Sequence, residues 1–278
     1  MRKVSCYRPG PRFPSISITG ARCELGCPHC AGRPLSAMLP AETPERLCEI
    51  AGRLDADGAL GFLLSGGCAP DGVLHLEAYL DAIKHIKRTT GLRINAHVGF
   101  PREREAAMLA SSGIDSFSIT YPMTDGIGKR FLAVGDAMAR YREASEALAG
   151  AGAGKVVPHA LIGLGDPRED AQGIKALAEE PPRSLVVIAF IPLRGTPLEG
   201  KEPAQESRII GSLELARELM PGTKLVLGCM RPRGRIEMER HLIETVLDGI
   251  AMPAVGTAAA LAGKVHISDV EGCCAVHL

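Results

Sequence analysis

The sequence contains no tryptophan, no excess of either charge and no long apolar run. Its 32 Lys and Arg residues are balanced by 32 Asp and Glu residues, so the formal net charge is zero. A general nucleic-acid-binding protein needs a basic excess to neutralise phosphates. No stretch approaches the roughly 20 apolar residues of a membrane span, and residues 1–9 lack the apolar core of a signal peptide. We therefore expect a cytoplasmic protein that binds neither nucleic acid nor membranes.

Cysteine is the residue present in unusual number. There are nine cysteines in 278 residues, and because nine is odd, complete internal pairing is impossible. The chain is also far larger than the secreted domains that disulfides hold together. Its apolar content of 46% is enough to bury a substantial core. The cysteines are therefore expected to be mostly free thiols or metal ligands.

Short apolar, β-branched runs alternate with longer segments of helical periodicity, which is typical of a parallel α/β sheet. The apolar runs predict strands over residues 15–19, 60–64, 92–99, 116–121, 156–164, 185–191, 224–227 and 250–255. The periodic segments predict helices over residues 44–54, 74–88, 102–111, 134–149, 169–178, 204–219, 235–247 and 257–262. This alternation predicts a single α/β domain over residues 1–278, either a (β/α)8 TIM-type barrel or a partial six-stranded barrel.

In such a barrel the chemistry lies on the loops that follow the strands. The unusual residues of this sequence cluster at those strand ends. We expect the N-terminal segment 1–14 and the C-terminal tail 264–278 to close this active-site face.

The loop after the first predicted strand carries Cys23, Cys27 and Cys30 in the spacing C-x3-C-x2-C. Three thiolates on so short a loop can bind three irons of a [4Fe–4S] cluster and leave the fourth iron open. Zinc is the alternative metal, with His29 or a distant cysteine as the fourth ligand. The spacing and the softness of the ligands favour the iron–sulfur cluster.

This three-cysteine loop resembles the signature of the radical S-adenosylmethionine (SAM) superfamily. The resemblance implies a [4Fe–4S] cluster whose open iron binds the amino and carboxylate groups of SAM. It also implies reductive cleavage of SAM to a 5′-deoxyadenosyl radical, which removes hydrogen from an unreactive C–H bond. The residue before the last cysteine is usually aromatic in that superfamily and lies near the adenine. His29 occupies this position here, and its alternative is a loop residue without a ligand role.

Three further strand ends resemble the SAM-binding loops of biotin-synthase-like radical SAM enzymes. Ser65, Gly66 and Gly67 resemble the Gly-Gly-Glu motif that holds the SAM amino group, although Cys68 stands where the acidic residue is expected. Gly163, and the pair Ile191 and Pro192, occupy positions that contact adenine and SAM in those enzymes. A plain turn is the alternative for each of these strand ends.

Four cysteines outside the loop form the set that we expect to bind a second, auxiliary [4Fe–4S] cluster. They are Cys6, Cys229, Cys273 and Cys274. Cys68 is a possible substitute, and Cys48 is expected to be an inert thiol in the core. The alternative is a set of unrelated free thiols. Arg231 and Arg233 are expected either to bind a carboxylate or the cluster environment, or to form a solvated basic turn.

The whole chain resembles biotin-synthase-like radical SAM proteins, and within them a subunit of the archaeal-type two-component lipoyl synthase. The second resemblance rests on residues 15–20 before the cysteine loop, on residues 65–68 and 228–232, and on the terminal residues 273–276. It implies sulfur insertion into an octanoyl chain on a protein lysine, with an auxiliary-cluster sulfide attacking the substrate radical. The implied partners are a sister radical SAM subunit, an octanoylated lipoyl-carrier protein and a ferredoxin or flavodoxin reductant.

Three other functions remain open from the sequence. One is another biotin-synthase-like reaction on a small-molecule substrate, such as a mutase reaction or a different sulfur insertion. Another is a noncatalytic iron–sulfur scaffold or electron carrier. The third is a structural zinc protein.

Overall fold

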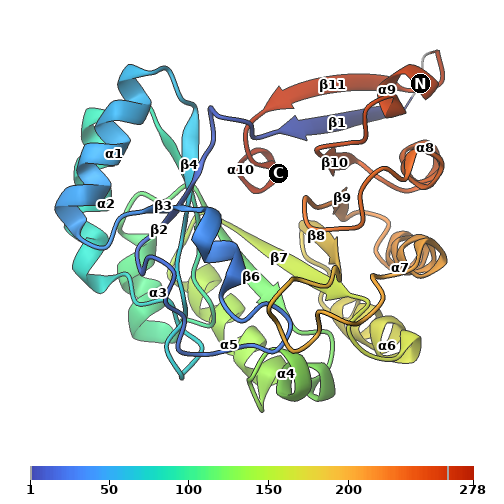
Figure 1. Cartoon of the computed structure of the whole chain (residues 1–278), viewed down its shortest axis with the longest axis horizontal. Helices are drawn as coiled ribbons and strands as arrows, with labels where there is room; N and C mark the ends of the chain where they lie inside the picture. Colours follow the sequence, from blue (N-terminus) through green and yellow to red (C-terminus); the bar gives the residue numbers. More distant parts are fainter. Residues whose placement is uncertain (1, 262) are drawn as a thin grey trace.

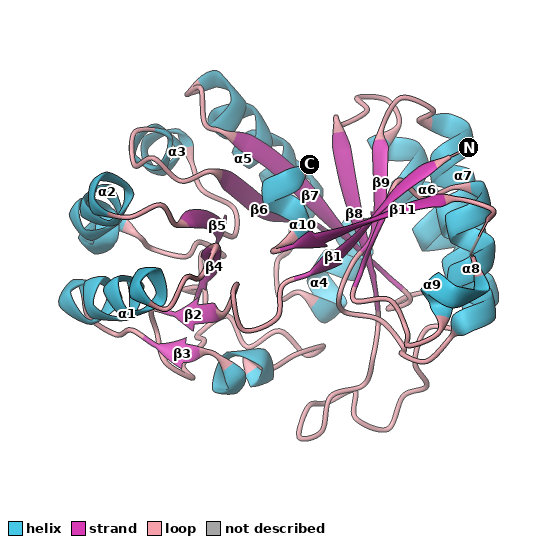
Figure 2. Ribbon diagram, turned by 90° about the horizontal axis from the view of Figure 1, so that it is seen from above, coloured by secondary structure: helices cyan, strands magenta, loops and turns pink. Residues whose placement is uncertain are grey.

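The computed structural model describes residues 2–261 and 263–278, and its strands form one curved, parallel sheet (Figures 1 and 2). The 11 strands follow the order β11-β1-β10-β9-β8-β7-β6-β5-β4-β2-β3, and every pairing between named strands is parallel. Their bounds are β1 Lys3–Arg8, β2 Ser15–Ser17, β3 Leu39–Pro40, β4 Gly61–Ser65, β5 Arg93–His97, β6 Ser116–Tyr121, β7 Lys155–Ile162, β8 Ser184–Ala189, β9 Lys224–Leu227, β10 Gly249–Ala251 and β11 His266–Glu271. In the described part of the chain, β3 and β11 are the free edges, so the fold is a partial barrel.

Helices cover the outer face of this sheet, and one short helix lies inside it (Figure 2). Their bounds are α1 Pro44–Ala56, α2 Leu80–Thr89, α3 Glu103–Ala110, α4 Asp125–Phe131, α5 Ala137–Gly150, α6 Pro167–Leu177, α7 Glu206–Leu219, α8 Ile236–Thr245, α9 Thr257–Ala260 and α10 Cys274–His277, with 3₁₀ turns η1 Arg33–Ala37 and η2 Glu77–Tyr79. Side-chain capping hydrogen bonds explain where α1 and α6 begin. The hydroxyl of Thr43 accepts the backbone N–H of Arg46 at the start of α1, and Asp166 and Glu169 form a capping box at the start of α6.

All eight predicted strands are present, and 116–121 and 224–227 have the predicted bounds. The predicted α/β barrel of parallel strands is confirmed in its partial form, because the sheet is open, and β1, β3 and β11 are strands beyond those predicted. The 74–88 helix is shorter than predicted, since a 3₁₀ turn precedes α2. The predicted 257–262 helix ends at Ala260 in α9, and residue 262 lies outside the described residues. Helices α4 and α10 are additions that the sequence pattern did not predict.

The two ends of the chain join the barrel itself. Strand β1 lies between β10 and β11, so the first and last strands pair with one another. Helix α10 lies inside the barrel, where Cys274 and Ala275 pack against Tyr7 and Val157. The ammonium of Lys155, at the start of β7, donates to the carbonyl of Val276 at 2.9 Å. Helix α10 is therefore a floor at the amino-terminal ends of the strands, and a closing role for residues 1–14 and 264–278 stays a prediction.

None of the helices in the described ranges 2–261 and 263–278 has both the length and the apolar character that crossing a membrane requires.

Candidate active site

The three-cysteine loop follows β2 and is fixed to the end of the neighbouring strand β4. The backbone N–H groups of Glu24 and Leu25 donate to the carbonyl of Cys68 at 3.2 and 3.1 Å. Thr19 joins the same two segments, because its hydroxyl accepts the N–H of Gly67 at 2.7 Å and donates to the carbonyl of Arg22 at 2.8 Å. The loop is thus held at the carboxyl ends of the strands, where this type of barrel carries its chemistry.

Gly67 is the point of closest approach between the cysteine loop and β4. A Cβ atom at this position would lie 2.0 Å from the carbonyl oxygen of Arg22 and 2.4 Å from the Cα of Cys23. Both atoms belong to the backbone, so no side-chain rotation relieves the clash. Glycine is required here because the chain that carries the first cysteine passes directly over it.

We expect Gly67→Ala to displace the cysteine loop and to lower the iron bound after anaerobic reconstitution by about half or more, as a backbone clash demands. Gly135→Ala is the matched control, since a Cβ there meets nothing within 4 Å. Iron counting and far-UV circular dichroism on both variants separate loss of the site from loss of the fold. Full iron content in Gly67→Ala would contradict this role.

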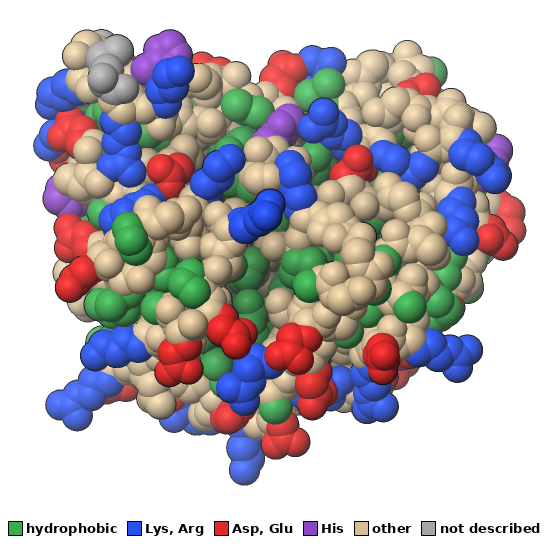
Figure 3. Space-filling view, turned by 180° about the vertical axis from the view of Figure 1, so that it is seen from behind, with side chains coloured by type: hydrophobic (Ala, Val, Ile, Leu, Met, Phe, Trp, Pro, Cys, Tyr) green, Lys and Arg blue, Asp and Glu red, His purple; other side chains and the backbone are tan. Residues whose placement is uncertain are grey.

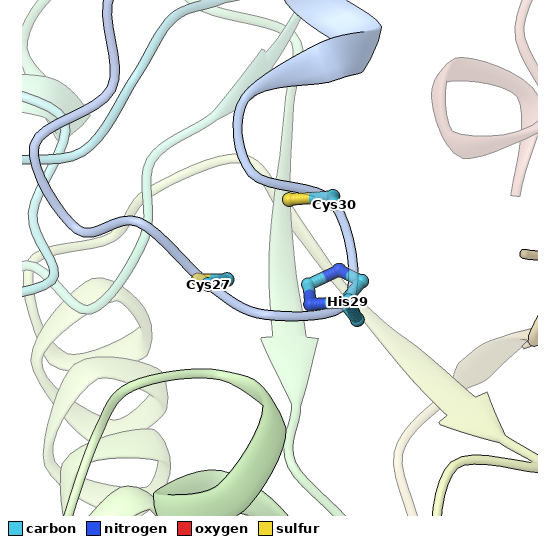
Figure 4. A group of neighbouring side chains, drawn as sticks. All are labelled: Cys27, His29 and Cys30. Carbon is cyan, nitrogen blue, oxygen red and sulfur yellow. The ribbon is translucent and has the colours of Figure 1, made fainter. Parts of the chain in front are cut away.

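The other side of the loop is held by the segment after α4. The Sγ of Cys27 lies 3.1 Å from the carbonyl oxygen of Leu132, and Nδ1 of His29 donates to the carbonyl of Phe131 at 2.9 Å. Cys27, His29 and Cys30 place their ligand atoms within 4.8 Å of one another, as Figure 4 shows. The loop therefore presents three soft or borderline ligands to one point.

The charges of these three side chains are coupled. The pKa of Cys30 falls to about 4, because hydrogen bonds from Cys27 and His29 and the charge of His29 outweigh burial. The same hydrogen bond, together with burial, raises the pKa of Cys27. Burial opposes protonation of His29, but its hydrogen bond to Cys30 and the charge of that thiolate raise its pKa. Cys30 is thus a thiolate at neutral pH, the form in which cysteine binds metals.

Cys23 completes the donor set from the other end of the loop. The Cβ of Cys23 would be 3.2 Å from a Cβ atom placed on Gly32, so the chain just after Cys30 folds back against it. The charge of Cys23 also raises the pKa of Cys27. Cys27 and Cys30 present their thiols to one point, Cys30 is already ionised, and Cys23 lies on the same loop, so the donor set fits a [4Fe–4S] cluster with one open iron. The fit rests on donor chemistry, and zinc would use the same thiolates with His29.

The strand ends predicted to bind SAM lie on the same rim as the cysteine loop. Ser65 is the buried last residue of β4, and its carbonyl accepts the N–H of Ile18 at 2.9 Å. Gly66 packs against Ile18 and Leu74. These contacts position the chain, and a role in SAM binding stays a prediction.

The rim continues past the ends of β7 and β8. Gly163 follows β7 with a φ of 92°, and its N–H donates to the carboxylate of buried Asp170 at 3.2 Å. Ile191 and Pro192 follow β8 and are half-buried. The sequence prediction did not include Asp170, which also pairs with Arg208 at 2.5 Å and so fixes the Gly163 turn.

Cys273 and Cys274 lie together at the start of α10, but among the described residues the group with metal-ligand spacing is Cys27, His29 and Cys30, which includes none of the four cysteines predicted for a second cluster. Cys273 and Cys274 are joined by a hydrogen bond, which raises the pKa of Cys274 together with burial and the charges of Cys273 and Cys229. Cys6 is separate, because it alternates with Tyr7 along β1 and Tyr7 faces α10. The thiol of Cys6 therefore faces the outer helices, where burial and the charge of Asp269 raise its pKa to about 11.

The remaining two cysteines, Cys68 and Cys48, lie in different parts of the fold. Cys68 lies against the cysteine loop, with the Sγ of Cys23 at 3.9 Å from its carbonyl oxygen. Cys48 lies in α1, and its Sγ is 4.0 Å from the carbonyl of Ala82 in α2, away from the rim. Binding of an auxiliary cluster by any of these cysteines stays a prediction.

Arg231 is not available to bind a carboxylate or a cluster, and it does not lie in a solvated turn, so both expectations for this residue are wrong. Its side chain is fully buried and pairs with the equally buried Glu239 at 2.7 Å. It also donates to the carbonyls of Gly228 and Ala251 at 2.6 and 2.7 Å. Arg233 is exposed but donates to the carbonyls of Met252 and Cys229. These arginines fasten the loops after β9 and β10 to one another.

Comparison with known proteins was made for sequence and for structure. No protein-family model matches the chain. The chain is 24% identical over 234 residues to the biotin synthase of Halorhodospira halophila, covering 81% of this chain and 70% of that protein. It is 23% identical over 232 residues to the biotin synthase of Bordetella pertussis, covering 78% of this chain and 66% of that protein. The chain thus spans about two thirds of the length of these biotin synthases.

Solved structures show the same fold. The FeFe-hydrogenase maturase HydG from Carboxydothermus hydrogenoformans superposes with a TM-score of 0.62 at 17% identity, covering 90% of this chain and 58% of that chain. Methylornithine synthase (PylB) gives 0.63 at 19% identity, covering 90% and 72% of the two chains. Streptococcus suis SuiB bound to S-adenosylmethionine gives 0.61 at 13% identity, covering 91% and 62%.

The protein is an α/β partial barrel of parallel strands with the radical SAM fold. By sequence, the chain is similar to biotin synthases at about 24% identity.

Proposed function

We propose that the chain is a biotin-synthase-like radical SAM enzyme that removes hydrogen from an unreactive C–H bond of a small-molecule substrate. The observation that carries the proposal is the cysteine loop, which converges at the rim of the barrel with Cys30 ionised. Similarity to biotin synthases over about four fifths of the chain supports it. A structural zinc site would not account for that similarity.

Cys23, Cys27 and Cys30 would hold the cluster, and the rim would hold SAM. When bound, the reduced [4Fe–4S] cluster supplies the electron that cleaves SAM and yields the 5′-deoxyadenosyl radical. Residues of the chain itself hold the cysteine loop and the rim in position. Thr19 and Gly67 fix the loop from one side, Phe131 and Leu132 fix it from the other, and Asp170 fixes the Gly163 turn.

Sulfur insertion is the narrower form of this proposal. Its support is the similarity to biotin synthases, together with the adjacent thiols of Cys273 and Cys274 in the interior of the barrel. A lipoyl synthase role, with an octanoylated carrier protein and a sister subunit as partners, rests on the resemblance of short motifs alone. A small-molecule substrate is therefore the better supported choice, and a ferredoxin or flavodoxin remains the proposed reductant.

The test is cleavage of SAM by the full chain after anaerobic reconstitution with iron and sulfide. With dithionite as reductant, we expect 5′-deoxyadenosine and methionine in equal amounts, measured by liquid chromatography. A control variant, Cys48→Ala, changes a thiol in α1 and should retain the activity. A protein that binds iron and sulfide without cleaving SAM would be a scaffold or electron carrier. A colourless protein that binds zinc and no sulfide would overturn the proposal as a whole.

A further inference from the structure

A groove lies on the outer side of the barrel, between helices α5 and α6. Its volume is about 1150 Å³, which is enough for a ligand of drug size. The groove is present because α5 packs chiefly against α3 and α4, whereas α6 packs against α7. Val156 and Pro158, the outward residues of β7 in the groove, have short side chains that leave the gap unfilled. This groove is separate from the cysteine loop, which lies at the rim.

The middle of the groove is apolar and held rigidly. Tyr121 at the end of β6 and Tyr141 in α5 are buried and meet edge to face, with ring centroids 4.8 Å apart. The hydroxyl of Tyr121 donates to the carbonyl of Gly173 at 2.7 Å, which ties β6 to α6. Leu177 of α6 and Pro158 of β7 complete this surface. An aliphatic chain that lies along it loses contact with water, which favours binding.

One end of the groove is basic. Lys155 and Lys224 are the first residues of β7 and β9, and Arg183 directly precedes β8. These three strands are neighbours in the sheet, so each places a cation at the same end of the barrel. Burial, together with the charges of Arg93 and Lys224, lowers the pKa of Lys155. The cations at this end therefore act on one another.

The chain leaves these three cations without ion pairs, as far as residues 2–261 and 263–278 show. Asp115 also lines the groove, but its carboxylate pairs with Lys87 at 2.7 Å and accepts the N–H of Ile94 at the same distance. The ammonium of Lys155 donates to the carbonyl of Val276 at 2.9 Å, which is an uncharged partner. A carboxylate group of a ligand would relieve the repulsion at this end.

The helical walls of the groove carry acidic side chains. Glu146 lies in the second half of α5, and Glu179 and Glu180 follow α6. The pKa of Tyr121 is raised by burial and also by the charge of Glu179. The pKa of Tyr141 is raised to about 12 by burial and also by the charge of Glu180. Both carboxylates therefore lie near the tyrosines in the middle of the groove.

The groove thus has opposite charges in different parts. Arg142 is the one cation on the α5 wall within the described lining, and it forms no ion pair with the three glutamates, so the walls keep a net negative charge. Figure 3, which views the molecule from behind, shows Lys and Arg side chains gathered above a hollow and Asp and Glu side chains below it. A ligand that matches the groove carries both charges, separated by an apolar part.

We propose that this groove binds a zwitterion whose carboxylate and ammonium groups are separated by an aliphatic chain. The carboxylate lies among the three cations at the strand starts, the ammonium lies among the three glutamates, and the chain lies along Pro158 and Leu177. Each end of the ligand then meets the opposite charge, and its middle covers apolar surface. This inference goes beyond the proposed function, because the groove lies outside the barrel and takes no part in SAM cleavage.

The first test is isothermal titration calorimetry on the reconstituted full chain with four probes: 8-aminooctanoate, octanoate, octylamine and glycine. We expect 8-aminooctanoate to bind about threefold more tightly than octanoate or octylamine, which is the effect of one partly exposed ion pair. Glycine has both charges but no chain between them, so it should bind at least tenfold more weakly. Equal affinity of 8-aminooctanoate and octanoate, or no saturable binding of 8-aminooctanoate, would overturn the inference.

The second test assigns each charge of the ligand to its end of the groove. Lys224→Met should weaken 8-aminooctanoate and octanoate about threefold and leave octylamine unchanged. Glu179→Gln should weaken 8-aminooctanoate and octylamine by the same factor and leave octanoate unchanged. Arg88→Met, which removes an exposed cation of α2, is the matched control and should change none of them. Unchanged binding of all probes in both groove variants would show that they bind elsewhere.

SAM cleavage is measured on the same variants as an independent readout. Lys224→Met and Glu179→Gln should both cleave SAM as the unmodified chain does, because their side chains lie at the outer groove. The binding pattern stands even if the unmodified chain does not cleave SAM, so failure of the proposed function and failure of this inference are distinguishable. Loss of SAM cleavage in both variants with circular dichroism unchanged would contradict the separation of the two sites.

Discussion

Replacing Cys23, Cys27 and Cys30 together with alanine should abolish SAM cleavage and remove about four irons per chain, the content of one [4Fe–4S] cluster. The physical reason is that Cys27 and Cys30 present their thiols to one point at the rim, Cys30 is already ionised, and Cys23 is the third thiol of the same loop. If the second cluster exists, the iron content should fall from about eight to about four. If it does not, the content should fall from about four to about zero.

The control is Cys48→Ala, whose sulfur lies between α1 and α2. It should keep the iron, the brown colour and the SAM cleavage of the unmodified chain. Both proteins should be compared by circular dichroism, because an empty loop need not unfold the barrel. Unchanged iron in the triple variant would show that the loop is not the cluster site. Zinc in place of iron would favour the closed site with His29.

The sequence predicts the centre of the barrel well and its edges poorly. Residues 185–191, which include most of β8, form a continuous apolar run, and burial on both faces of a parallel sheet produces that pattern directly. Strand β1 begins and ends with a charged residue and pairs with β11, whose partner residues lie some 260 positions later. Such pairing depends on the closure of the whole chain, which local periodicity does not contain.

The residues of the candidate site also divide into those that the local sequence predicts and those that depend on how distant strands pair. The cysteine loop is predictable because all three donors lie within eight residues and their spacing alone sets the chemistry. The contact between the rings of His97 in β5 and His159 in β7, whose centroids lie 5.8 Å apart, is not predictable, because the two residues meet only through the register of the sheet. Cys6 illustrates the opposite case. The sequence groups Cys6 with the cysteines of the C-terminal tail because all are thiols. Neighbouring residues of β1 face opposite sides of the sheet, however, so Tyr7 faces the barrel interior and Cys6 faces the outer helices.

Arg231 is the residue for which sequence and structure differ most. In the sequence, Arg231-Pro232-Arg233-Gly234 reads as an exposed basic turn that could bind an anion. In the structure Arg231 is 1% exposed and its partner Glu239 is 0% exposed. Glu239 in turn accepts the N–H of Ala254 at 2.7 Å and the hydroxyl of Thr257 at 2.8 Å. One ion pair therefore joins the loop after β9, helix α8 and the loop after β10.

Arg231→Met should lower the free energy of unfolding by about 3–5 kcal/mol, because it leaves Glu239 as a buried charge without its partner. Urea unfolding of the full chain at neutral pH measures this loss. The matched control is Arg233→Met, since Arg233 is exposed and its removal should cost about 1 kcal/mol or less. Adding Glu239→Gln to Arg231→Met should recover part of the loss, because the uncompensated charge is then gone. Equal stability of Arg231→Met and Arg233→Met would show that the buried pair is not what fastens these loops at the rim.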